Sequence, residues 1–306
     1  MSTHHTSPTA RTARTVRRLV LPALPVLAVA GVLAATGSPA GATPSAVTCG
    51  TVVTTDVRLT ADLVDCPASG LVVGAPGITI DLAGHAIDGT GSGAGIDNEA
   101  GHDDVRIRRG TVRDFVFGVV LFQADGARLD RVDAIANLDG FNVASSVDVE
   151  LDRVAAVGNV GPGVEITFSD QVTVRRSTFT DNGLWGVVDR FSERSHHVGN
   201  TIVGNDAPGL TLDRTGGAVV ERNRIADNAG HGIELVAVVD AQVVRNDADA
   251  NSGDGISIDS PGNLLRGNRT AGNAGGGIVA PEGTVDGGGN RARGNGGADC
   301  TGVSCR

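Results

Sequence analysis

The chain has 306 residues, a formal net charge of −10 and 40% hydrophobic residues, and all of its basic side chains other than histidine are arginines. An acidic balance argues against nucleic acid as a partner, because such binding depends on neutralising phosphates. It also argues against docking on anionic lipid and is typical of a protein that is soluble outside the cell.

The first 42 residues have the features of a cleaved signal peptide. Four arginines between residues 11 and 18 precede an uncharged apolar run from Leu19 to Ala35, and Ala40-Gly-Ala42 fits a small-x-small cleavage site. A retained membrane anchor is the alternative, which Pro22 and Pro25 disfavour. Both the Sec and the twin-arginine export routes stay open. Removal of the four arginines from a chain of charge −10 leaves −14. We expect a secreted, extracellular monomer without membrane contact after cleavage.

The mature chain contains four cysteines, which an exported protein can pair. Three connectivities are open. Proximity in the sequence favours Cys49 with Cys66 and Cys300 with Cys305, so that each end of the mature chain has one disulfide. A zinc site is the alternative, but the two pairs lie far apart in the sequence.

A short motif recurs along the chain: Asn, three variable residues, Gly, and then two apolar residues around one free position. Asn228-Ala-Gly-His-Gly-Ile-Glu-Leu235 is one copy. The glycine recurs in steps of 22 or 23 residues at Gly95, Gly118, Gly140, Gly163, Gly186, Gly209, Gly232, Gly255 and Gly277. A fixed period of this length indicates a solenoid.

Each repeat shows apolar residues alternating with period two, which predicts strands, and no stretch has helical spacing. Three short strands per repeat predict an all-β, single-domain, right-handed parallel β-helix of about nine or ten coils of 22–23 residues. We expect an N-terminal cap and first coil at 43–92, coils at 93–298, and a C-terminal disulfide loop at 299–306. The ends need covering, because open sheet edges aggregate.

Several segments resemble one family. Cys49-Gly, Asp62-Leu, Asp81-Leu-Ala-Gly-His85 and the repeated motif are similar to secreted bacterial right-handed β-helix repeat proteins of the pectate-lyase-like superfamily. The resemblance covers essentially all of the mature chain and implies the fold. It implies no single activity, because that superfamily includes lyases, hydrolases, epimerases, tailspikes and a copper-delivery protein.

The repeat assigns side chains to columns. Positions one and three after the glycine are apolar and should point inward, except Asn98 and Asp189. We expect a local bend near Asp189, or its pairing with Arg190 or Arg214, because an unpaired buried Asp is costly. The recurring asparagine should form an internal ladder at a turn. The recurring glycine should supply a backbone angle that only glycine adopts cheaply.

Function should therefore lie on outward positions of one sheet. Two carboxylates beside a histidine could perform acid–base chemistry on a glycoside, so Glu234, His231 and Asp254 are the candidate catalytic residues. The candidate substrate-binding residues around them are Trp185, Arg190, Thr211, Asp213 and Ser257. Trp185, Phe117 and Phe122 could add a modest stacking platform. The alternative interpretation is that an acidic repeat protein brings carboxylates together by chance.

The functional hypotheses differ in class. No complete catalytic motif of the hydrolase, lyase or epimerase branches is present, so we expect a module that binds an extracellular polysaccharide or a partner along one sheet face. The alternative is an enzyme acting on an acidic glycan. No metal site is assigned, although the carboxylates could hold Ca²⁺ against an acidic sugar. Copper delivery would require Met, Cys or clustered His, and the only Met is Met1.

Overall fold

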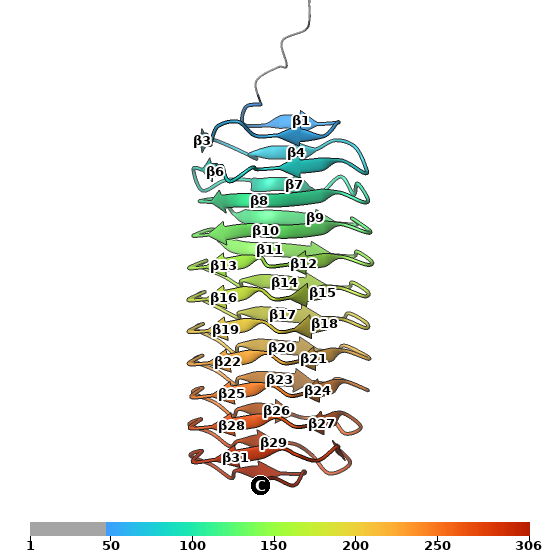
Figure 1. Ribbon diagram of the computed structural model, residues 1–306, viewed down its shortest axis with the longest axis vertical. Coiled ribbons are helices and arrows are strands. Elements are labelled where there is room, and N and C mark those ends of the chain that lie inside the picture. Colours follow the sequence, from blue (N-terminus) through green and yellow to red (C-terminus); the bar gives the residue numbers. More distant parts are fainter. Residues whose placement is uncertain (1–46) are drawn as a thin grey trace, which may run out of the picture. The chain divides into compact units, whose positions relative to one another are not determined.

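Residues 47–306 are described by a computed structural model (Figure 1). The predicted signal peptide lies outside the described residues. Residues 47–306 wind into an all-β parallel solenoid of about 11 turns, as the period predicted. In this part of the chain no helix has the length and apolar character needed to cross a membrane.

One coil consists of three short strands separated by bends. In a central coil these are β14 (Val164–Thr167), β15 (Thr173–Arg175) and β16 (Thr178–Thr180), and β17 (Val187–Arg190) begins the next coil. Each strand pairs in parallel with the equivalent strand one coil later, so that Val164 lies opposite Val187. The prediction of three strands per coil is confirmed.

Sheet A consists of the first strand of every coil (Figure 1). Its other members are β1 (Thr51–Val53), β4 (Leu71–Val73), β7 (Ala94–Asn98), β9 (Phe117–Phe122), β11 (Asp139–Ala144), β20 (Leu210–Asp213), β23 (Ile233–Val236), β26 (Ile256–Ile258), β29 (Ile278–Val279) and β32 (Cys300–Thr301). Strands β1 and β4 precede the recurring motif, and for this reason the turns outnumber those counted from the glycines.

The second and third strands of each coil form two further stacks. The second stack contains β2 (Val57–Arg58), β5 (Thr79–Asp81), β12 (Glu150–Asp152), β15, β18 (His196–Val198), β21 (Val219–Glu221), β24 (Gln242–Val244), β27 (Leu264–Arg266) and β30 (Val285–Asp286). The third contains β3 (Leu63–Cys66), β6 (Ala86–Gly89), β13 (Ala155–Val157), β16, β19 (Thr201–Val203), β22 (Arg224–Ala226), β25 (Asp247–Asp249), β28 (Arg269–Ala271) and β31 (Arg291–Arg293). Strands β8 (Arg106–Arg113) and β10 (Arg128–Ile135) run through both stacks and join them.

The inward columns of sheet A form one wall of the core, which the inward residues of the other two stacks complete. Position one after the glycine is buried in every coil, as at Val164, Leu210 and Ile233, and position three is buried as at Ile166 and Leu235. These aliphatic side chains stack coil on coil, so a single continuous core runs along the solenoid.

Two asparagine ladders run through the interior at the bends. The side-chain oxygen of Asn228 accepts hydrogen bonds from the backbone N–H and the side-chain amide of Asn205 at 3.1 and 2.9 Å. Its own amide donates to the Ile202 carbonyl and to Asn251. A second ladder runs through Asn200, Asn223, Asn246, Asn268 and Asn290. The structural interpretation of the asparagine column is confirmed.

The recurring glycine is required for space and not for its backbone angle, which corrects the prediction. Gly232 does not have a positive φ, but a Cβ there would lie 2.5 Å from the Gly255 carbonyl oxygen and 2.7 Å from the Asn251 amide nitrogen. The left-handed backbone occurs instead at bends, where non-glycine residues such as Arg176 (φ 52) and Asp181 (φ 56) adopt it.

Asp189 is buried without a bend, and the predicted pairing with Arg190 or Arg214 is wrong. It stays in register between Ile166 and Leu212. Its carboxylate lies 3.2 Å from Nε2 of His197, which is also fully buried. His197 belongs to β18, so the partner of Asp189 comes from the facing stack across the core.

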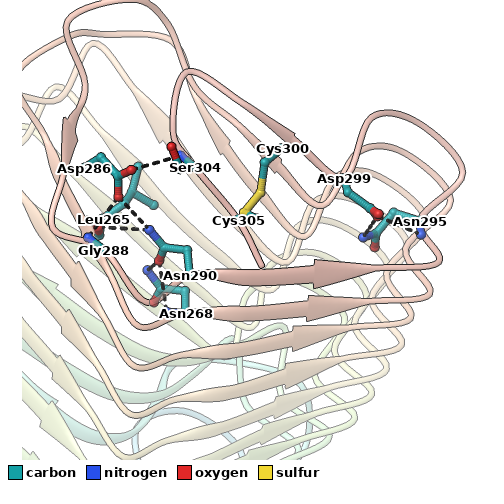
Figure 2. Close-up of a disulfide and its surroundings, with 10 residues drawn as sticks. All are labelled: Leu265, Asn268, Asp286, Gly288, Asn290, Asn295, Asp299, Cys300, Ser304 and Cys305. Atoms are coloured by element: carbon teal, nitrogen blue, oxygen red, sulfur yellow. Dashed lines mark hydrogen bonds between the residues drawn. A yellow bond between two sulfur atoms is a disulfide. The ribbon is translucent and has the colours of Figure 1, made fainter.

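Both predicted disulfides are present near the ends. Cys49 is bonded to Cys66, and Cys300 is bonded to Cys305. At the C-terminal end, Asp286 accepts backbone N–H groups from Ser304 and Gly288 (Figure 2). These hydrogen bonds hold the pKa of the Asp286 carboxyl below its usual value.

Candidate ligand-binding groove

Three columns of side chains point outward from sheet A, and the aromatic ones lie on or beside two of its strands, β9 and β17. Phe117 and Phe122 lie on β9, Trp185 lies two residues before the start of β17, and Arg190 ends β17. Strands β9 and β17 are three steps apart in the sheet order. At about 4.8 Å per step, the aromatic side chains span ~14 Å along the solenoid.

A pocket of 340 Å³ opens on this face. It is lined by Glu99, Phe117, Val120, Phe122 and Asn142. Two aromatic rings and an aliphatic side chain provide an apolar surface, and the Asn142 amide and the Glu99 carboxylate provide a donor and acceptors. Pockets of this composition hold organic ligands with a few directional hydrogen bonds.

Asp139 lies in register with Phe117 on the neighbouring strand, beside the pocket. Burial and the nearby Glu165 carboxylate raise the pKa of Asp139 to about 6. Its side chain lies against Gly161, which leaves room for it because it has no Cβ. None of the described residues donates a hydrogen bond to the Asp139 carboxyl.

A comparison with Asp254, the equivalent residue before the recurring Gly255, explains that missing donor. Asp254 occupies the same column and lies against Gly275 as Asp139 lies against Gly161. There the backbone N–H of Gly276 donates to the Asp254 carboxylate at 2.6 Å. The residue equivalent to Gly276 beside Asp139 is Pro162, which has no N–H to donate.

Glu165 is held in an ion pair beyond the pocket on the same outward face of sheet A; the pocket and this stretch as far as Arg190 are called the groove below. Arg190 donates to Glu165 at 2.8 Å, and both side chains are 25% exposed. The Arg190 guanidinium also lies 4.7 Å from the centroid of the Trp185 ring. The pair and the stacking contact fix Arg190, so its charge is already neutralised and its position is defined.

The predicted catalytic residues lie at β23 and β26, four and five steps in the sheet order from β11, the nearest strand of the pocket. His231 and Asp254 come together, with Nδ1 of His231 3.4 Å from a carboxylate oxygen of Asp254. Nδ1 also accepts the backbone N–H of Asp254 at 2.9 Å. Glu234 instead accepts a hydrogen bond from Thr211 at 3.0 Å. These contacts each satisfy polar groups within the coil stack.

The predicted binding residues lie in two places: some beside the pocket and some beside the predicted catalytic residues. Trp185 and Arg190 join the groove with Glu165. Thr211 is 5% exposed and is occupied by its bond to Glu234. Asp213 lies 3.6 Å from Arg214. Ser257 is opposite Glu234 in the register of β23 and β26.

Asp139 and Asn142 were missed as site residues from the sequence. Both belong to the outward columns, but neither is part of a histidine- or carboxylate-rich motif. One signal was available: Pro162 and Pro208 interrupt the column that contains Asp139, and a proline there removes a donor facing the preceding coil. The pocket itself depends on how Phe117 and Phe122 lie, which the column assignment does not determine.

Comparison with known families gives one match. Residues 96–291, more than half of the chain, match the family described as "Periplasmic copper-binding protein (NosD)". No curated protein matches closely enough to be considered a relative.

Solved structures share the architecture. The A-module of mannuronan C-5 epimerase AlgE6 of Azotobacter vinelandii has a TM-score of 0.52 at 19% identity, covering 79% of this chain and 81% of that one. Pectate lyase Pel9A has a TM-score of 0.58 at 14% identity, covering 72% and 71%. The periplasmic alginate epimerase AlgG has a TM-score of 0.54 at 16% identity, covering 82% and 70%. At these identities the similarity establishes the fold alone.

Proposed function

The chain belongs to the NosD family, and we propose that this member is an exported protein that binds a polysaccharide along the outward face of sheet A. The pocket between Phe117 and Phe122 is the observation that carries the proposal. Aromatic rings beside amide and carboxylate groups suit a sugar, which has apolar ring faces and hydroxyl edges. Trp185 extends the apolar surface along the face.

The structural neighbours support a glycan as the class of ligand. They are named for mannuronan, pectate and alginate, all of which are polysaccharides. Solenoids of this kind offer an extended face, which matches an extended polymer better than a small molecule. Two disulfides are typical of an exported protein, and we propose that this one is extracellular.

The described residues do not fit the copper named in the family description. Residues 47–306 contain no methionine, and all four cysteines are in disulfides. No group of three or more His, Cys, Asp or Glu side chains in that range could hold a metal ion. His197 is buried against Asp189, and Nδ1 of His231 accepts a backbone N–H. Copper sites use thioether, thiolate or imidazole ligands together, and these ligands are not assembled here.

Cleavage of the bound glycan is the second candidate function, favoured by one observation. Asp139, with a pKa of about 6, lies near Glu165, which Arg190 pairs as a carboxylate. Two carboxyl groups whose environments differ in this way can act as an acid and a base. Binding is the simpler function, because it requires only the groove.

Binding is tested with the secreted chain from residue 43 by affinity electrophoresis and calorimetry against a panel of plant, algal and bacterial polysaccharides. Trp185→Ala and Phe117→Ala should each weaken binding by roughly tenfold, because stacking and burial of an aromatic ring contribute about 1–2 kcal/mol.

The matched control is Phe168→Ala. Phe168 is 66% exposed and stacks on Phe191 at the bend after β14, outside the outward columns of sheet A. It should bind as the wild type does. Thermal unfolding verifies that the variants fold. Failure of the wild type to bind any polysaccharide, or equal losses in all three variants, would contradict the proposal.

A further inference from the structure

Charge on the outward face of sheet A restricts which glycan the groove can hold. From β7 to β26, the three outward columns contain one arginine, Arg190, and eight carboxylates. The carboxylates are Asp97, Glu99, Asp139, Glu165, Asp213, Glu234, Asp254 and Asp259. A row of like charges on one face produces a negative potential along the path of any polymer bound there.

The basic groups near the groove are already paired. Arg190 is bound to Glu165, and Arg214 lies against Asp213 and over the ring of Phe191. The charge of each guanidinium is therefore offset by a neighbouring carboxylate before an acidic sugar approaches. Recognition of carboxylates in proteins normally uses an arginine available for two parallel hydrogen bonds.

The carboxylates beside the pocket are not neutralised. Glu99 lines the pocket, and Asp97, on the same strand end, accepts neutral donors from Ser69 and from the Glu99 backbone. Asp139 lies next to Phe117 and has no ion-pair partner among the described residues. These groups accept hydrogen bonds from sugar hydroxyls, which are neutral donors, but repel a polymer that carries carboxylates.

We infer that the groove takes a neutral, hydroxyl-rich glycan and discriminates against polyuronates. The inference rests on the proposed glycan binding and specifies its ligand. It separates this chain from the structural neighbours named for mannuronan, pectate and alginate, which are polyuronates. Aromatic rings for the sugar faces and carboxylates for the hydroxyl edges together provide the complementarity.

The test uses one polymer in two charge states. A neutral polysaccharide that binds in the panel is compared with the same polymer after oxidation of its primary hydroxyls to carboxylates. At low salt and pH 7.5, oxidation should weaken binding to the wild type by roughly tenfold or more. Higher salt should reduce the difference in affinity between the neutral and the oxidised polymer, because screening weakens the repulsion. The comparison is run with and without Ca²⁺.

Variants assign the effect to the groove. The double variant Glu99→Gln, Asp139→Asn removes two negative charges beside the pocket and should bring the affinities for the neutral and oxidised polymers to within about threefold. The matched control, Asp240→Asn, removes an exposed carboxylate from the bend between β23 and β24 and should keep the wild-type difference.

Each outcome separates the two proposals. Binding of polyuronates alone, or equal binding of the oxidised polymer with or without Ca²⁺, would overturn the inference while leaving glycan binding intact. Unchanged discrimination in the double variant would also overturn it, because the charges would then not be the cause. If the panel shows no binding at all, both the inference and the proposed function are wrong.

Discussion

Asp139 and Asp254 show how one backbone atom changes a side chain's chemistry. Both lie in the same column, and both carboxyls lie against a glycine of the next coil. Asp254 accepts the N–H of Gly276, whereas Asp139 faces Pro162, which has none. A carboxylate without a donor in a half-buried site keeps its proton to a higher pH, and the neighbouring Glu165 adds to this effect.

Asp139→Asn should stabilise the fold at neutral pH. The folded-state pKa of Asp139, about 6, is above the ordinary value of 3.8, so the folded protein holds this proton more tightly. The protonated Asp139 carboxyl therefore contributes favourably to the stability of the folded protein below pH 4, and this contribution is lost as the pH rises through 6. The variant should therefore exceed the wild type by about 1–2 kcal/mol at pH 7.5, after discounting for partial exposure, and by little at pH 4. Denaturant unfolding across pH measures the difference.

Two further variants isolate the missing donor. Pro162→Gly provides an N–H where Gly276 provides one for Asp254, so the pKa of Asp139, followed by carboxyl carbon shifts in NMR, should fall. Asp254→Asn should give no stability gain at pH 7.5, because it removes an acceptor that is satisfied. A pKa that does not change in Pro162→Gly would show that burial and Glu165 alone account for it.

At the scale of the element, each asparagine ladder connects successive coils. Asn228→Ala removes the acceptor for two donors of Asn205 and leaves the Ile202 carbonyl without its amide. The loss should be about 2–4 kcal/mol, since buried polar groups without partners are costly. Asn295→Ala is the comparison at the end of the same ladder: Asn295 accepts the same two donors from Asn273, but it lies in the last coil and is partly exposed, so water can replace it and the loss should be about 1 kcal/mol or less. Equal losses would show that burial of the rung does not determine its contribution to stability.

The fold could be predicted from the repeat period and the alternation of apolar residues. Both are local properties of the sequence, and together they assign each residue to the inside or the outside of the solenoid. The pairing of Asp189 with His197 could not be predicted in this way. The two residues lie on different strands of one coil, and their contact depends on the width of the core between the stacks. The glycine column was predicted correctly in position, but its cause is the close approach of the next coil's carbonyl oxygen, which depends on how successive coils pack.

The candidate site was likewise predictable only in part. The outward columns that contain Trp185 and Arg190 were predicted from the period. The region chosen within them, around His231, was selected by residue type, because histidine beside carboxylates is typical of catalysis. The structure instead places a pocket at Phe117 and Phe122, where ring orientation creates the volume.

At the scale of the whole molecule, a solenoid has to protect the edges of its end coils. The last coil is closed by the disulfide between Cys300 and Cys305 (Figure 2). The backbone of Cys305 also pairs with that of Asn290 in an isolated parallel β-bridge. The separation of 5 residues makes this a small loop, so its contribution to global stability through chain entropy is modest. Its main effect is to hold the final segment over the exposed edge.

Replacing Cys300 and Cys305 by serine should therefore open the C-terminal coil without unfolding the rest. Hydrogen exchange should accelerate in β31 and β32, and light scattering should show concentration-dependent association through the uncovered edge. The contrasting variant replaces Cys49 and Cys66, which close a separation of 17 residues with Cys66 fully buried, and should lower global stability by about 3 kcal/mol. If the C-terminal variant instead lost exchange protection uniformly along the solenoid, the disulfide would be supporting the whole core rather than covering its end.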